Sequence, residues 1–241
     1  MAHMAKKVIL FVVEGPSDET AFALPFTRVF DRHLVTFDVT HCDITTKYAN
    51  KRADRYGSEL NVKERVRDQI IEHIKGKPYE WDDMQRIVHI VDTDGAFISD
   101  EKVVPSLDAR LLYFEDHVEA SDKEGICKRN YRKRHALAQL CCVSELKVRS
   151  KAVPYAVYYL SRNMEHVLHG RGDDVSDEEK KRLSHEFRRR FQNDPEGFRS
   201  FLSTSAFAVK GDYAESWRYV REGIHSLERC SNLHLVLPPT E

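Results

Sequence analysis

Residues 8–18 read Val-Ile-Leu-Phe-Val-Val-Glu-Gly-Pro-Ser-Asp, an apolar run that ends at an acid. Residues 87–95 repeat this arrangement, with Ile-Val-His-Ile-Val followed by Asp-Thr-Asp-Gly. Apolar runs without polar alternation are typical of strands that are buried on both faces in the middle of a parallel sheet. Ligands of open α/β sheets bind in the crevice outside the carboxyl ends of such strands. The sequence therefore predicts an α/β fold in which the acids after both strands meet at one edge.

Four carboxylates should gather at this edge: Glu14, Asp18, Asp92 and Asp94. Such carboxyl groups titrate at about pH 4 in water, so at neutral pH all four would be charged and would repel one another. A bound cation relieves this repulsion, and hard oxygen ligands favour Mg²⁺ or Mn²⁺. The pattern thus predicts a divalent-metal site.

The motifs Glu-Gly-x-x-Asp at 14–18 and Asp-x-Asp at 92–94 resemble the two signatures of the Toprim domain, in the same order. Toprim domains occur in topoisomerases, bacterial primases and the OLD-family nucleases. The resemblance implies a mostly parallel, Rossmann-like sheet flanked by helices. It also implies a metal-dependent nuclease that cuts DNA or RNA, in which Asp18, Asp92 and Asp94 ligate metal and Glu14 ligates it or acts as general base. Standalone proteins similar to the OLD family often serve prokaryotic anti-phage defence, which is the wider role implied here.

Three further residues enter through the same resemblance. A predicted strand at 153–160 is followed by Arg162 and Glu165, as in an OLD-family segment where an acid opens a helix. Glu165 would then support the metal, and Arg162 would contact a phosphate. Some OLD-like nucleases carry a late lysine that assists phosphate chemistry, and Lys210 suits this place. The structural alternatives are a helix-start glutamate stabilised by the helix dipole, an arginine paired with an acid, and a surface lysine.

A basic stretch at 47–56 follows the predicted strand at 35–40 and should lie at the same edge as the acids. Its four basic side chains are Lys47, Lys51, Arg52 and Arg55. With two tyrosines for stacking, these side chains are predicted to hold the backbone of a nucleic acid. A solvated charged loop is an equal alternative.

The composition is that of a globular protein: 241 residues, 41% hydrophobic, 32% charged, with a net charge of −1. We interpret 4–241 as a single domain, with a charged helical insert at about 107–151 and a helical C-terminal part. Within the insert, acids precede bases, which favours a pair of self-neutralising helices over a nucleic-acid surface. The near-zero net charge confines any nucleic-acid surface to a local patch.

We expect no signal peptide, and no apolar run approaches the roughly 18 residues of a membrane span. Its five cysteines show no metal-binding spacing. We therefore expect a cytoplasmic protein with reduced thiols and no membrane partner. An activating protein partner and a homo-oligomer both stay open.

Two other functions compete with the nuclease. Asp92–Gly95 also resembles the first motif of the haloacid-dehalogenase phosphatases, and Ser161 and Lys210 suit their later motifs. That interpretation leaves Glu14 unexplained, and a full β-α-β-α unit precedes the motif, which usually opens that fold. The other alternative is a non-catalytic, metal-dependent nucleic-acid-binding module.

Overall fold

A five-stranded sheet in the order β2-β1-β3-β8-β7 forms the centre of the molecule. The structure is a computed structural model, and it describes residues 7–30, 35–41, 62–108, 110–172 and 175–239. The strands are β1 (Lys7–Val13), β2 (Val35–His41), β3 (Met84–Asp92), β7 (Glu145–Val148) and β8 (Lys151–Leu160). The first four strands in this order run parallel, and β7 pairs with β8 in the antiparallel direction. The predicted α/β fold with a mostly parallel sheet is therefore confirmed.

Seven α-helices accompany the sheet within the described residues. They are α1 (Pro16–Phe30), α2 (Val62–Ile74), α3 (Lys123–Leu140), α4 (Met164–His169), α5 (Asp177–Phe191), α6 (Pro195–Leu202) and α7 (Tyr213–Arg221). Short 3-10 helices are η3 (Trp81–Asp83), η4 (Asp100–Lys102) and η5 (Leu233–Val236). The C-terminal part is helical, as expected from the sequence.

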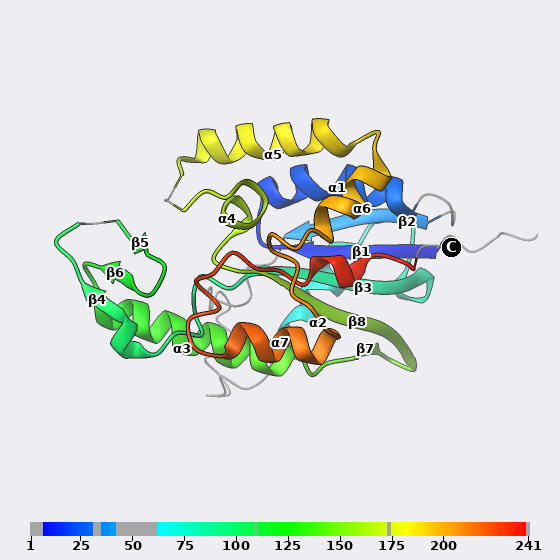
Figure 1. The fold of residues 1–241 in the computed structure, drawn as a ribbon. Coiled ribbons are helices and arrows are strands. Elements are labelled where there is room, and N and C mark those ends of the chain that lie inside the picture. The colour runs from blue at the N-terminus through cyan, green and yellow to red at the C-terminus, as the bar shows by residue number, and fades with distance from the viewer. Residues whose placement is uncertain (1–6, 31–34, 42–61, 109, 173–174, 240–241) are drawn as a thin grey trace, which may run out of the picture.

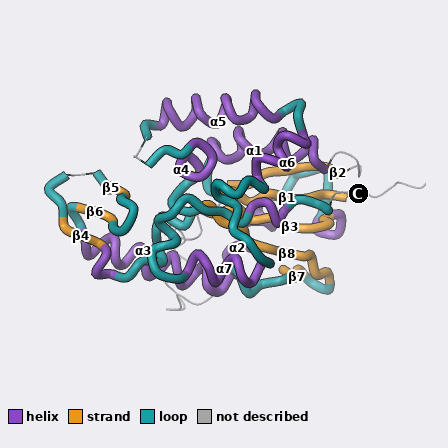
Figure 2. The backbone as a smooth tube through the Cα atoms, viewed as in Figure 1, coloured by secondary structure: helices purple, strands orange, loops and turns teal. Residues whose placement is uncertain are grey.

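The helices form one layer on each face of the sheet (Figures 1 and 2). Helices α1, α5 and α6 lie on one face, and α2, α3 and α7 lie on the other. Consecutive residues of β1 point into opposite layers, so Leu10 belongs to the core cluster that includes Leu137 of α3, while Phe11 packs with the aromatic cluster of α1 and α6. This two-sided burial is the physical reason why β1 is apolar at every position.

A second, three-stranded sheet in the order β4-β6-β5 lies beyond the end of the main sheet (Figure 1). Its strands are β4 (Val103–Pro105), β5 (Leu112–Tyr113) and β6 (Val118–Ala120). The expectation of a helical insert at about 107–151 is wrong for β5, β6 and β7 and correct for α3. In β6 the buried Val118 and Ala120 flank the half-buried Glu119, a period of two that produces a strand in spite of the acidic composition.

None of the described helices combines the length and apolar composition that a membrane span requires. The four cysteines in the described part of the chain are free thiols.

Candidate functional site

Glu14 and Asp92 are brought together because their strands are neighbours in the sheet. β1 and β3 are parallel, and Val12 lies opposite His89, so both strands end at the same edge. Glu14 follows the last residue of β1, Asp92 is the last residue of β3, and a Glu14 carboxylate oxygen accepts a hydrogen bond from the Asp92 amide at 3.2 Å. The predicted meeting of these two acids at the carboxyl edge is confirmed.

Asp18 joins this edge from the first turn of α1. Its carboxylate accepts a hydrogen bond from the Gly15 amide at 2.9 Å, which folds the Glu-Gly-x-x-Asp motif into a tight turn between β1 and α1. Pro16 is the first residue of the helix, where its missing N–H costs nothing. The charges of Glu14 and Asp18 both act on Asp92, so the acids of this motif lie near Asp92.

Asp94 is held by the end of β8. The Asp94 amide donates to the Arg162 carbonyl at 2.9 Å, and the Arg162 amide donates to the Thr93 hydroxyl at 3.0 Å. Asp94 has a φ of 49° and Gly95 a φ of 65°, both in the left-handed region. At Gly95 an added Cβ would lie 2.7 Å from a Leu227 methyl, so the position requires glycine for both conformation and space.

Lys133 of α3 enters the same cluster from the opposite direction. Its ammonium lies 2.5 Å from Asp94 Oδ2 and 3.2 Å from Glu14 Oε1, and its side chain is 0% exposed. Burial alone would lower the pKa of Lys133, but the charges of Asp94, Glu14 and Asp92 outweigh burial and raise that pKa above its ordinary value. One turn earlier on α3, the Arg129 guanidinium donates to the Asp94 carbonyl at 2.9 Å. The acid cluster therefore contains a protonated, buried lysine.

The two aspartates of the Asp-x-Asp motif differ in electrostatics. Burial and the charges of Glu14, Asp18 and Asp94 raise the pKa of Asp92 well above its ordinary value, and Lys133 opposes this only in part. Burial also acts on Asp94, but Lys133 and Arg129 outweigh it and lower the Asp94 pKa. The Asp94 side of the cluster is thus compensated by positive charge, whereas the Asp92 side retains unfavourable negative charge.

Lys133 is the site residue that the sequence analysis missed, because it belongs to a basic run that was interpreted as self-neutralising. Lys128 fits that interpretation, since its ammonium lies 2.6 Å from Glu124 one turn away. A signal was present in the spacing, because Lys133 lies three, four and seven residues before the buried Ala136, Leu137 and Leu140. A lysine on the apolar stripe of a helix faces the core and needs an acidic partner there.

The carboxylate oxygens of this acid cluster are ligands of the type that a hard divalent cation such as Mg²⁺ prefers. Among the described residues, however, no group of three or more His, Cys, Asp or Glu side chains is placed to hold a metal ion. The reason is visible in the contacts: Lys133 engages Asp94 and Glu14, and the Gly15 amide engages Asp18. Asp92, Asp18 and Glu14 are the carboxylates that would hold such an ion.

The other predicted site residues lie apart from this cluster or in different surroundings. Glu165 is the second residue of α4 and is 4% exposed, but it is not among the charges that act most on Asp92 or Asp94. Its place in the first turn suits the helix-dipole alternative. Asn163 caps this helix by accepting from the His166 amide at 2.9 Å.

Arg162 is buried, and its guanidinium contacts backbone carbonyls where the sequence analysis expected a phosphate or an acid. It donates to the Phe114 carbonyl at 2.7 Å and to the Gly172 carbonyl at 3.5 Å, and it lies over the Tyr113 ring. These contacts tie the end of β8 to the β5–β6 hairpin, and burial lowers the Arg162 pKa.

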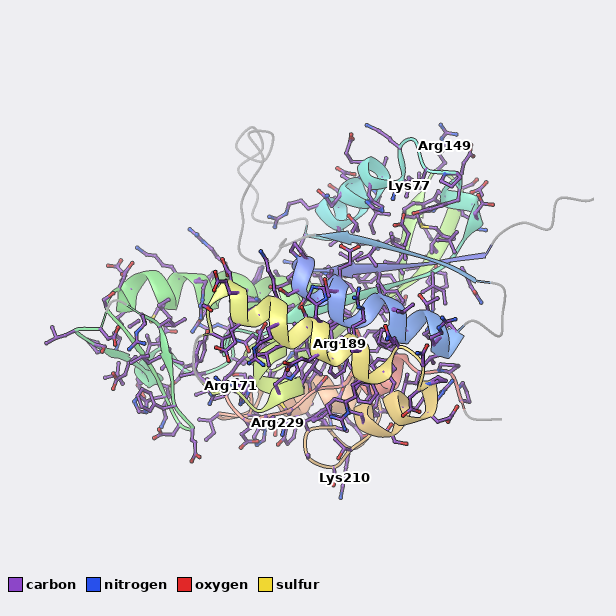
Figure 3. The ribbon with its side chains drawn as sticks, turned by 90° about the horizontal axis from the view of Figure 1, so that it is seen from above. Lys77, Arg149, Arg171, Arg189, Lys210 and Arg229 are labelled. Carbon is purple, nitrogen blue, oxygen red and sulfur yellow. The ribbon has the colours of Figure 1, made fainter. Side chains whose placement is uncertain are left out.

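Lys210 projects into solvent from the loop between α6 and α7 (Figure 3). A cavity of about 400 Å³ beside it is lined by residues 205–210 with Tyr219, Arg229 and Cys230, none of which belongs to the acid cluster. The four basic residues Lys47, Lys51, Arg52 and Arg55 lie outside the described residues.

The chain matches no protein family, no curated protein and no solved structure.

Proposed function

We propose that this protein is a Toprim-type, divalent-metal-dependent nuclease that hydrolyses phosphodiester bonds in DNA or RNA. The observation that supports the proposal is the direct contact between the two motifs, Glu14 to the Asp92 amide at 3.2 Å, at the carboxyl edge of a parallel sheet. A role in anti-phage defence belongs to the same proposal and rests on the motif resemblance.

The exposure of the side chains indicates which groups would meet a substrate. The Glu14 and Asp94 side chains are 18% and 25% exposed, whereas Lys133 is fully buried. A phosphodiester at this edge would therefore meet the carboxylates, and Lys133 would act through them. When bound, Mg²⁺ or Mn²⁺ supplies charge neutralisation at the phosphate and a more acidic water.

Glu14 is the best-placed general base among the four acids. One of its oxygens lies 3.2 Å from both the Asp92 amide and the Lys133 ammonium, which orients the carboxylate that would take a proton from the attacking water. The water oxygen forms the new bond to phosphorus as the bond to the leaving oxygen breaks. The Lys133 ammonium places a positive charge 3.2 Å from this carboxylate.

A haloacid-dehalogenase-like phosphatase is the second candidate, and one observation favours it. Asp92 ends the central strand of the main sheet, as a phosphoryl-accepting aspartate would, and a lysine lies beside the second aspartate of the motif. In that mechanism Asp92 forms an aspartyl-phosphate and Glu14 is peripheral. In the third candidate, a binding module, nucleic acid is bound without being cut.

The three functions are separated by assaying Glu14→Gln and Asp92→Asn on nucleic acid and on a small phosphomonoester, with Mg²⁺ or Mn²⁺. The wild type should cut nucleic acid and leave the monoester intact. Both variants should lose cutting by at least ~100-fold, the scale of a lost acid–base group. Glu101→Gln, an exposed acid in η4, is the matched control and should keep full activity.

Trapping of a phosphorylated Asp92, or full cutting by Glu14→Gln, would contradict the nuclease proposal. Binding of nucleic acid without cleavage by the wild type would favour the binding module.

A further inference from the structure

The cavity of about 400 Å³ beside Lys210 lies between the loop after α6 and the segment before η5. Residues 206–209 give it an apolar wall, and two basic side chains, Lys210 and Arg229, also line it. Both basic residues lie on the same side of the molecule (Figure 3), and among the described residues no aspartate or glutamate lines the cavity. This size, with apolar walls and few polar groups, is typical of a site for a small organic molecule.

Arg229 is held in one orientation by groups that do not neutralise its charge. Its Nε donates to the Val167 carbonyl at 2.9 Å, and its Cζ lies 5.4 Å from the centroid of the Phe207 ring. The two outer nitrogens of the guanidinium have no hydrogen-bond partner among the described residues. The side chain is therefore fixed by its inner nitrogen, and its outer nitrogens are left for a ligand.

No carboxylate compensates this guanidinium within the part of the chain that the structure describes. Burial lowers the pKa of Arg229, and no neighbouring acid opposes that effect. The adjacent acid, Glu228, accepts a hydrogen bond from the Tyr219 hydroxyl at 2.7 Å. Lys210 likewise forms no ion pair with a described residue. A partly buried positive charge without a partner is unfavourable, and a bound anion removes this cost.

The walls of the cavity are fastened to each other by backbone hydrogen bonds. The Ser231 amide donates to the Phe207 carbonyl at 2.8 Å, and the Val209 amide donates to the Ser231 carbonyl at 3.0 Å. On the other side, the Cys230 amide donates to the Ser161 hydroxyl at 2.8 Å, which ties the cavity to the end of β8. The cavity is thus preformed, and a ligand would bind without having to order these segments.

We infer that this cavity binds a small organic phosphate monoester, of the size of a nucleoside monophosphate. The site is independent of the proposed nuclease site, because no residue that lines the cavity belongs to the acid cluster. A phosphate monoester carries about −1.5 to −2 charges at neutral pH, which matches the two cations. The outer nitrogens of Arg229 suit two phosphate oxygens, Lys210 adds a charge at the exposed rim, and the organic part lies against residues 206–209.

The test is titration calorimetry of the full-length chain with adenosine 5′-monophosphate, adenosine and inorganic phosphate, in buffer with a chelator. The monophosphate should bind once per chain, adenosine should not bind, and inorganic phosphate should bind at least ~10-fold more weakly because it lacks the apolar contacts. Arg229→Gln should weaken binding of the monophosphate by at least ~10-fold, the scale of a lost hydrogen bond to a charged group. Arg189→Gln removes an exposed arginine of α5 that does not line the cavity, and it should bind as the wild type does.

Lys210→Gln covers the case in which Arg229→Gln does not fold, because Lys210 is exposed. It should weaken binding of the monophosphate about 3-fold, since one nearby charge is lost in a solvated position. Glu14→Gln should bind the monophosphate as the wild type does. Loss of binding in Glu14→Gln would place the ligand at the acid cluster and overturn the inference. Absence of binding, equal binding of adenosine or inorganic phosphate, or unchanged binding by the Arg229 and Lys210 variants would also overturn it.

Discussion

Helices α3 and α5 are both strongly charged, yet they use their charges differently. On α5 the buried side chains are Leu183, Ser184, Phe187 and Phe191, and Arg182 pairs on the surface with Glu179 and Glu186. On α3 a lysine lies on the buried face and reaches two acids of the main sheet. One charge of α5, that of Lys180, also acts on Asp94, but it is the weakest of the named causes.

The difference shows that a run of charged residues in the sequence does not indicate which of its side chains are exposed and which are buried. An exposed pair is held in water of high dielectric and contributes little, whereas a buried charge without a partner is strongly destabilising. Replacing Arg182 should therefore change the stability little, whereas replacing Lys133 or the carboxylates that it contacts should change the stability strongly. Three measurements of stability test this contrast, in order of decreasing effect.

The largest effect is expected for Lys133→Met in metal-free buffer. The change removes the ammonium that contacts both Asp94 and Glu14, and losing one partner of a buried ion pair costs about 3–5 kcal/mol of unfolding free energy. Chemical denaturation monitored by circular dichroism measures it. Lys128→Met, in the same helix, should lose less than about 1 kcal/mol because its pair with Glu124 is exposed. Equal losses in the two variants would contradict the contrast between buried and exposed charges.

Replacing Asp94 or Asp92 by asparagine should change the unfolding free energy in opposite directions, in metal-free buffer at neutral pH. Asp94→Asn removes a partner of Lys133 and should cost roughly 2 kcal/mol, in the range of a hydrogen bond to a charged group. Asp92→Asn removes a charge repelled by its neighbours and should stabilise the protein by on the order of 1 kcal/mol. Destabilisation of similar size by both variants would show that Lys133 stabilises the two carboxylates equally.

The stability of the wild type should depend on pH through Asp92 and Asp94, and the same unfolding measurement, repeated at several pH values, tests this. The Asp94 pKa is lowered on folding, so its stabilisation is present above its ordinary pKa of 3.8 and is lost as pH falls through the folded value. The Asp92 pKa is raised on folding, so its cost is present at neutral pH and disappears as pH falls through that raised value. Acidification should therefore first stabilise the wild type and then destabilise it below about pH 4, and Asp92→Asn should lack the first phase.

The smallest effect is expected for Arg182→Gln on α5. Its partners Glu179 and Glu186 lie at 3.5 and 2.7 Å, but the Arg182 side chain is 57% exposed. Exposed helix pairs of this kind contribute about 0.3–0.5 kcal/mol each, and salt screens them. The unfolding free energy should fall by less than about 1 kcal/mol, and the difference should vanish at about 1 M salt, where the screening length is short. A salt-independent loss would show that Arg182 has a buried role.

The sequence by itself determined the four parallel strands of the main sheet, though not the antiparallel β7, and the meeting of Glu14 with Asp92. The reason is that a strand buried on both faces must be apolar throughout, and parallel neighbours bring the residues after them to one edge. The helices after residue 160 were also readable, since Leu183, Phe187 and Phe191 recur at helical spacing.

Only the tertiary structure decided what compensates the acids. Lys133 is separated from Glu14 by more than a hundred residues, and nothing in its neighbourhood along the chain distinguishes it from Lys128 except the apolar stripe that it shares. The packing of α3 against the sheet selects which of these lysines is buried. The energy of a buried charge depends on the groups around it in space, and this is why a local pattern of acids and bases predicted a self-neutralising helix where the fold places a cation inside the site.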